Sequence, residues 1–146
     1  MKFEPLSKRE EDIAKIIVDA ACCVHKELGH GLLEKVYEIS FCHELTKRGL
    51  LYQRQIDVPI VYDGVTFDEG LRLDVLVENL IICELKAMNN MNPIWETQVL
   101  SHLKLTRRLG ISKLRFFVVS LLRMTLLVIL SASEESNLMF RNFNHA

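Results

Sequence analysis

Three charged residues interrupt two apolar segments in the middle of the chain. Asp74 lies inside the segment 71–77, and Glu84 and Lys86 lie inside the segment 80–86. Charged side chains are rarely buried unless they are paired or bind a metal. Two carboxylates on one face would hold a divalent cation, and oxygen ligands suit Mg²⁺ or Mn²⁺. Such a metal activates water and stabilises charge on a phosphoryl oxygen. The spacing alone fits a partly solvated Asp–Lys–Glu cluster at a sheet edge equally well.

The turn between these segments decides whether the three side chains share a face. Side chains alternate along a strand, so Glu84 and Lys86 point to the same side. A strict two-residue turn at positions 78–79 would point Asp74 to the opposite side. A three-residue turn, or one β-bulge, would bring Asp74 opposite or diagonal to Glu84, roughly 5–8 Å away. We predict this irregularity, because a metal site requires it.

Two helices are predicted in the first third of the chain. The first runs from Lys8 to Leu28, with Ser7 and Glu10 as a capping box and Gly29 at its end. Its apolar residues recur every three or four positions: Ile13, Ile16, Ile17, Ala20, Val24 and Leu28. The second helix runs from about Leu32 to Arg48 and ends at Gly49.

The rest of the sequence predicts strands around a third helix. The elements are a strand over 55–61, a hairpin turn at Asp63-Gly64, strands over 71–77 and 80–86, a helix from Pro93 to about Leu109, and strands near 114–120 and 124–130. The polar tail, residues 131–146, is expected to fray. The order ααβββαββ predicts an α+β domain around one central sheet.

Length and charge limit the class of protein. The chain has 146 residues, 49% of them apolar, which fits a single globular domain. Its 18 basic and 19 acidic residues give a net charge of −1, which disfavours a basic protein that coats nucleic acid. A local basic groove remains compatible with that balance.

Membrane insertion and secretion are both disfavoured. The apolar segment 114–132 contains Arg115 and Arg123, so two buried strands fit it better than a spanning helix. The N-terminus has no apolar core behind its first charges, as a secretory signal would. The 4 cysteines form no C-x-x-C pair, so we expect reduced thiols in a cytoplasmic protein.

The chemistry-bearing residues resemble a known family. Asp74, Glu84 and Lys86 resemble the D…(D/E)-x-K pattern of the PD-(D/E)XK nuclease superfamily. The segment Gly-Leu-Leu-Glu-Lys-Val-Tyr at 31–37 is similar to the G-x-x-E-x-x-Y signature of a group of small bacterial proteins in that superfamily. Further matches are His25, Leu28, Gly29, Glu38, Arg72, Leu73, Ala87, Gln98 and the segment 103–106. The resemblance covers roughly residues 8–110.

The resemblance implies a fold and a set of site residues. The fold is a restriction-endonuclease-like core, αβββαβ, with a central mixed sheet flanked by helices in one domain over residues 1–146. Asp74, Glu84 and the backbone carbonyl of Leu85 would bind the metal. Lys86 resembles the catalytic lysine, and Glu34 resembles a helix-borne glutamate that joins the metal shell, often through water.

Two further residues extend the resemblance, and one region departs from it. Gln98 takes the place of a glutamine that orients the lysine or the substrate strand in exonuclease-like members. The tyrosine expected four residues later is His102 here. Tyr37 fits either a hydrogen bond within the site or a place in the core. After Gly110 the family usually continues with a strand like L-I-N-F and a turn that contains glycine. No such glycine turn appears here, which suggests a diverged C-terminus.

The function implied is a Mg²⁺- or Mn²⁺-dependent nuclease that cleaves DNA. The alternative is a catalytically inactive relative that binds nucleic acid or protein as a regulatory module. A third reading, a structural interaction protein, would show no response to metal. A homodimer would let two sites address the two strands of a duplex.

Overall fold

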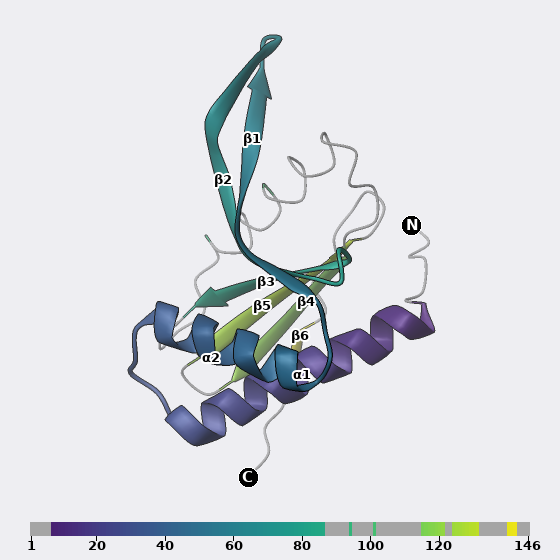
Figure 1. Ribbon diagram of the computed structural model, residues 1–146, viewed down its shortest axis with the longest axis vertical. Coiled ribbons are helices and arrows are strands. Elements are labelled where there is room, and N and C mark those ends of the chain that lie inside the picture. The colour runs from purple at the N-terminus through teal and green to yellow at the C-terminus, as the bar shows by residue number, and fades with distance from the viewer. Residues whose placement is uncertain are drawn as a thin grey trace.

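The computed structural model describes residues 7–86, 94, 101, 115–121, 124–131 and 140–142, and these form an α+β fold. Its helices and strands are α1 (Lys8–Leu28), α2 (Glu34–Lys47), β1 (Tyr52–Tyr62), β2 (Val65–Val77), β3 (Ile81–Lys86), β4 (Arg115–Leu121), β5 (Met124–Ser131) and β6 (Phe140–Asn142). Figure 1 shows α1 and α2 lying across the same part of the sheet. The α+β class is confirmed, and the arrangement is consistent with a restriction-endonuclease-like core.

The first helix has the ends that its sequence predicts. Ser7 caps α1 by accepting a hydrogen bond from the Glu10 N–H, and the Glu10 carboxylate accepts one from the Ser7 N–H. Gly29 follows the helix with a φ of 67°, a conformation in which a side chain would be strained. The capping box and the C-terminal glycine are both confirmed.

The second helix starts two residues later than expected, at Glu34. Leu33 precedes it in an extended conformation and provides no side-chain cap. The helix ends at Lys47, and Gly49 follows with a φ of 75°. Glu34 is therefore in the first turn, where the helix dipole favours a negative charge.

The described strands form one mixed sheet in the order β1-β2-β3-β5-β4-β6. Every neighbouring pair is antiparallel except β4 and β6, which are parallel. The strands expected near 114–120 and 124–130 are present as β4 and β5. Strand β6 lies within the tail that was expected to fray, and no pattern in the sequence had indicated it. The expected helix from Pro93 lies outside the described residues apart from Ile94 and Ser101, which are helical.

The turn between β2 and β3 has the predicted third residue. Val77 pairs with Ile81, so positions 78–80 form the turn, and the Leu80 N–H donates to the Val77 carbonyl at 3.0 Å. Glu78 and Asn79 have φ values of 52° and 53°. The earlier hairpin, between β1 and β2, closes through Asp63 and Gly64 alone.

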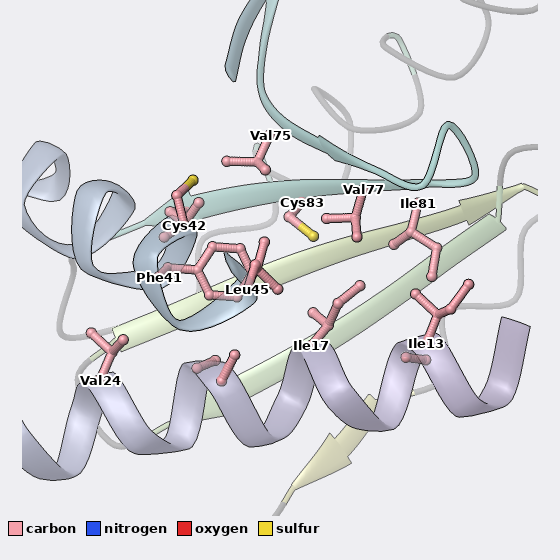
Figure 2. Close-up of a cluster of buried hydrophobic side chains, with 14 of the residues drawn as sticks. Ile13, Ile17, Val24, Phe41, Cys42, Leu45, Val75, Val77, Ile81 and Cys83 are labelled. Atoms are coloured by element: carbon pink, nitrogen blue, oxygen red, sulfur yellow. The ribbon is translucent and has the colours of Figure 1, made fainter. Parts of the chain in front are cut away.

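The main core lies between the two helices and one face of the sheet (Figure 2). The buried residues that form it are Ile13, Ala14, Ile17, Ala20, Ala21, Val24, Tyr37, Phe41, Cys42, Leu45, Val75, Val77, Ile81, Cys83 and Leu85. In β2 and β3 these are the odd-numbered positions. Strand alternation therefore directs Asp74, Glu84 and Lys86 to the opposite face.

The far half of the β1–β2 hairpin projects beyond the sheet (Figure 1). We call residues 59–70 the arm. A shift in register between Val58 and Ile60 marks its base, where a Cβ on Gly70 would lie 1.9 Å from the Val58 carbonyl oxygen. Only glycine fits there, and the bulge bends the hairpin. The apolar side chains of the arm are largely exposed, Tyr62 most of all at 73%.

Candidate active site

The site begins with two carboxylates on neighbouring strands. Val75 pairs with Cys83, so the next residues outward, Asp74 and Glu84, lie side by side on β2 and β3. Glu84 is 4% exposed and Asp74 is half-buried. One carboxylate oxygen of Asp74 accepts a hydrogen bond from the Leu85 N–H at 3.0 Å. The three-residue turn thus brings together the side chains that the sequence analysis expected.

The electrostatics of this pair favour a cation. Burial raises the pKa of Asp74 to about 7, and the charge of Glu84 and a hydrogen bond with its side chain act in the same direction. The Leu85 N–H and the charge of Lys86 oppose that rise in pKa but do not cancel it. The Asp74 carboxyl therefore keeps its proton up to near-neutral pH, which indicates that the site lacks positive charge. A divalent cation between the two carboxylates would displace that proton.

Lys86 and Glu34 complete the charged group. Lys86 is the last residue of β3, and its Nζ lies 3.6 Å from a carboxylate oxygen of Glu34 in the first turn of α2. Glu34 is therefore in the site region, paired with the lysine. The four side chains Asp74, Glu84, Lys86 and Glu34 carry three potential negative charges and one positive charge.

The loop that leads into α2 explains the glycine and the tyrosine of the 31–37 segment. Gly31 has a φ of 91°, which favours glycine. The Tyr37 hydroxyl donates to the Gly29 carbonyl at 2.7 Å and accepts from the Leu32 N–H at 3.2 Å. Tyr37 is also part of the buried core. It ties the loop to the core, and so fixes where α2 and Glu34 begin.

A second buried carboxylate, Glu38, lies one helical turn after Glu34. Its two oxygens accept hydrogen bonds from Arg54 Nε at 2.9 Å and from Gln55 Nε2 at 2.7 Å, both on β1. In the β1–β2 register Gln55 lies opposite Asp74, between the pairs on either side of it. Glu38 matches the family pattern, but no role for it is predicted from the sequence. The i, i+4 spacing from Glu34 was the available signal.

The donor set of the site fits a hard divalent cation. Within the described residues, no three His, Cys, Asp or Glu side chains cluster closely enough to hold a metal by themselves. Asp74 and Glu84 provide two carboxylates, and a backbone carbonyl with water would complete an oxygen shell for Mg²⁺ or Mn²⁺. Gln98 and His102 lie outside the described residues.

The described part of the chain has no helix that is both long and apolar enough to cross a bilayer.

A family model described as the PD-(D/E)XK nuclease superfamily matches residues 11–118. That range includes Glu34, Asp74, Glu84 and Lys86. No curated protein and no solved structure matches the chain.

Proposed function

The chain belongs to the PD-(D/E)XK nuclease superfamily, and we propose that it is a Mg²⁺- or Mn²⁺-dependent nuclease that hydrolyses phosphodiester bonds in DNA. One observation carries the proposal. Asp74 and Glu84 share a face of the sheet beside Lys86, because the turn between β2 and β3 has three residues. We further propose that the chain belongs to the G-x-x-E-x-x-Y group, a proposal supported by the distinct contacts or conformations of Gly31, Glu34 and Tyr37 around the start of α2.

Asp74, Glu84 and the Leu85 carbonyl are the proposed metal ligands, with Glu34 joining through water. The bound ion would neutralise charge on the scissile phosphate and lower the pKa of a bound water. The Leu85 N–H holds one oxygen of Asp74, and this leaves the carboxylate a defined orientation. Burial of Glu84 excludes the competing water that would screen its charge.

Lys86 is the proposed catalytic lysine. Its ammonium group lies 3.6 Å from a carboxylate oxygen of Glu34, and its positive charge lowers the pKa of Asp74. From there it would orient the attacking water and move a proton from it. Gln98 is proposed to orient the lysine or the substrate strand. The net charge of −1 gives little non-specific attraction to DNA, so we expect substrate to be selected by structure or delivered by a partner.

Thermal melts with and without Mn²⁺ test the metal site. Mn²⁺ at 100 times its dissociation constant should stabilise the wild type by about 2.7 kcal/mol. Asp74→Ala should abolish that rise in melting temperature. Absence of any Mn²⁺ response in the wild type would refute a metal site at Asp74 and favour a structural interaction protein.

Cleavage assays separate a nuclease from an inactive binding module. Linear, nicked, branched and single-stranded DNA would be incubated with the wild type and with Lys86→Ala, with Mg²⁺ or Mn²⁺. The proposal requires cleavage by the wild type and its loss in Lys86→Ala, while the Mn²⁺-induced rise in melting temperature persists. A metal-binding wild type that cuts no DNA would instead support the regulatory module.

The cytoplasm is the proposed location of the protein, and its four free cysteines support this proposal.

A further inference from the structure

Helix α2 reaches two different strands through two glutamates one turn apart. Glu34 pairs with Lys86 at the end of β3, and Glu38 accepts hydrogen bonds from Arg54 and Gln55 on β1. Strand β2, which carries Asp74, lies between β1 and β3. Positions four residues apart on a helix are separated by about 6 Å along its axis. The two contacts therefore bracket the strand that holds the first proposed metal ligand.

The Glu38 carboxylate is buried, and its negative charge is paired with the positive charge of Arg54. Among the described residues, Glu38 and Glu84 are the charged side chains with the least exposure, at 6% and 4%. Arg54 approaches Glu38 with both Nε and a terminal nitrogen, each 2.9 Å from the same oxygen. A buried charge of this kind is costly unless its partners are held in place. The geometry of α2 against β1 is therefore narrowly defined at this point.

The backbone of β1 is unusual at the same place. Gln55 has a φ of 51°, a left-handed conformation that is strained for any residue other than glycine. It lies opposite Asp74 in the register. Its side chain donates to Glu38 at 2.7 Å. Such conformations persist where the surrounding structure over-determines them, and they concentrate at functional sites.

We propose that Glu38 is a positioning residue for the nuclease site. By holding α2 against β1 beside Asp74, it fixes the place of Glu34, and Glu34 in turn holds Lys86. The inference rests on the proposed function, because it assigns Glu38 a part in that reaction. Glu38 itself touches neither the metal nor the substrate in this scheme.

The test compares Glu38→Gln with Glu44→Gln. Glu44 lies on the same helix, has a similarly low exposure and pairs with Lys47 and Arg48, away from the site. Both variants remove one charge from α2 and disrupt an ion pair, which joins α2 to β1 for Glu38 and stays at the end of α2 for Glu44. Steady-state cleavage would be measured with saturating Mg²⁺, well below each melting temperature. We expect kcat to fall about 10- to 100-fold in Glu38→Gln with little change in KM, and to stay near the wild-type value in Glu44→Gln.

A double-mutant cycle gives a readout that a merely structural role would not move. If Glu38 acts through Glu34, the variant Glu34→Gln/Glu38→Gln should have the same kcat as Glu34→Gln alone. Gln55→Gly should also lower kcat, although it relieves the strained backbone, because it removes one of the two donors to Glu38. Independent, multiplying effects of Glu34 and Glu38 on kcat would overturn the proposal, as would an unchanged kcat in Glu38→Gln.

Hydrogen exchange separates failure of this inference from failure of the proposed function. Amides of residues 38–41, which donate to the carbonyls in the first turn of α2, should exchange faster in Glu38→Gln than in Glu44→Gln. Equal exchange in both variants, with an active wild type, would overturn the inference and leave the nuclease proposal standing. A folded, metal-loaded wild type that cuts no DNA would refute the proposed function, and the role of Glu38 in the reaction would fall with it.

Discussion

The two hairpins that share β2 close through turns that differ by one residue. The β1–β2 hairpin closes through Asp63 and Gly64, with φ values of 50° and 73° that match a two-residue turn. The β2–β3 hairpin closes through positions 78–80. The first turn ends an exposed arm (Figure 1), whereas the second lies beside the core and aligns two carboxylates.

The register of β3 on β2 therefore decides whether the two carboxylates share a face. If Val77 paired with Leu80 instead of Ile81, alternation would direct Asp74 and Glu84 to opposite faces. A one-residue change at the first turn would alter only the arm. The two halves of β2 differ accordingly: residues 75–77 pair with both β1 and β3, whereas the described pairs of residues 65–67 are with β1.

The largest expected effect comes from deleting Ile82, which shifts the rest of β3 by one residue against β2. Either Cys83 and Leu85 leave the core and Glu84 turns towards it, or β3 loses its pairing with its neighbours. We expect loss of most of the folding free energy, on the order of 5 kcal/mol or more. Chemical denaturation measures this directly.

The matched control inserts one glycine after Gly64 in the first turn. It should change the unfolding free energy by no more than about 1 kcal/mol and leave the Mn²⁺-induced rise in melting temperature intact. If the deletion variant kept both its stability and its Mn²⁺ response, the register of β3 would not set the geometry of the site.

The second effect is a pH dependence that belongs to the buried half of β2. The folded pKa of Asp74, about 7, exceeds its ordinary value of 3.8, so the folded state holds a proton more tightly than the unfolded chain. The contribution of Asp74 to stability without metal is therefore fully present below its unfolded pKa of 3.8 and is lost as pH rises through the folded pKa of about 7. Because metal binds the ionised carboxylate, the Mn²⁺-induced rise in melting temperature should grow over the same range.

Asp74→Asn is the control for this pH dependence. Subtracting its unfolding free energy from that of the wild type at each pH isolates the Asp74 contribution. A difference that stays constant between pH 4 and pH 8 would show that the carboxyl titrates alike in the folded and unfolded chains.

The three-residue turn could be predicted from the sequence because chemistry and alternation together allowed few choices. Given that Asp74 and Glu84 form a site, strand parity demands an extra residue, and positions 78–80 provide it. The capping box of α1 was equally local, since Ser7 and Glu10 contact each other within one turn. Such features depend on residues close in sequence, so spacing is enough to find them.

The hydrogen bonds between Glu38 and β1 could not be predicted in the same way. Glu38 and Gln55 are 17 positions apart, and their contact depends on how α2 crosses the sheet. The positive φ of Gln55 has no glycine or turn signal in the sequence. Strand β6 is a similar case, because its parallel pairing with β4 joins the tail to a distant segment. Tertiary packing decides such features, and a single sequence does not encode it locally.

The third effect compares the same substitution in the two halves of β2. Val77 is fully buried in the core, whereas Val65 is 54% exposed in the arm. Val77→Ala should destabilise the protein by about 2 kcal/mol, since it removes buried methyl groups and leaves a cavity. Val65→Ala should change the unfolding free energy by no more than about 0.5 kcal/mol. Equal losses in urea denaturation would mean that the arm packs against another part of the protein in solution.

The smallest expected effect concerns whether the arm contributes to DNA binding. Residues 59–70 include Asp63, Asp68 and Glu69 and no lysine or arginine. Phosphate groups are repelled by such a segment, so the exposed aromatic rings of Tyr62 and Phe67 are poorly placed to reach a nucleic acid. The variant Tyr62→Ser/Phe67→Ser should leave the dissociation constant for DNA and the cleavage rate within about twofold of the wild type. Fluorescence anisotropy with labelled DNA measures the first quantity. A tenfold weakening of DNA binding in the arm variant would place the substrate against the arm, because stacking on aromatic rings would then outweigh the repulsion.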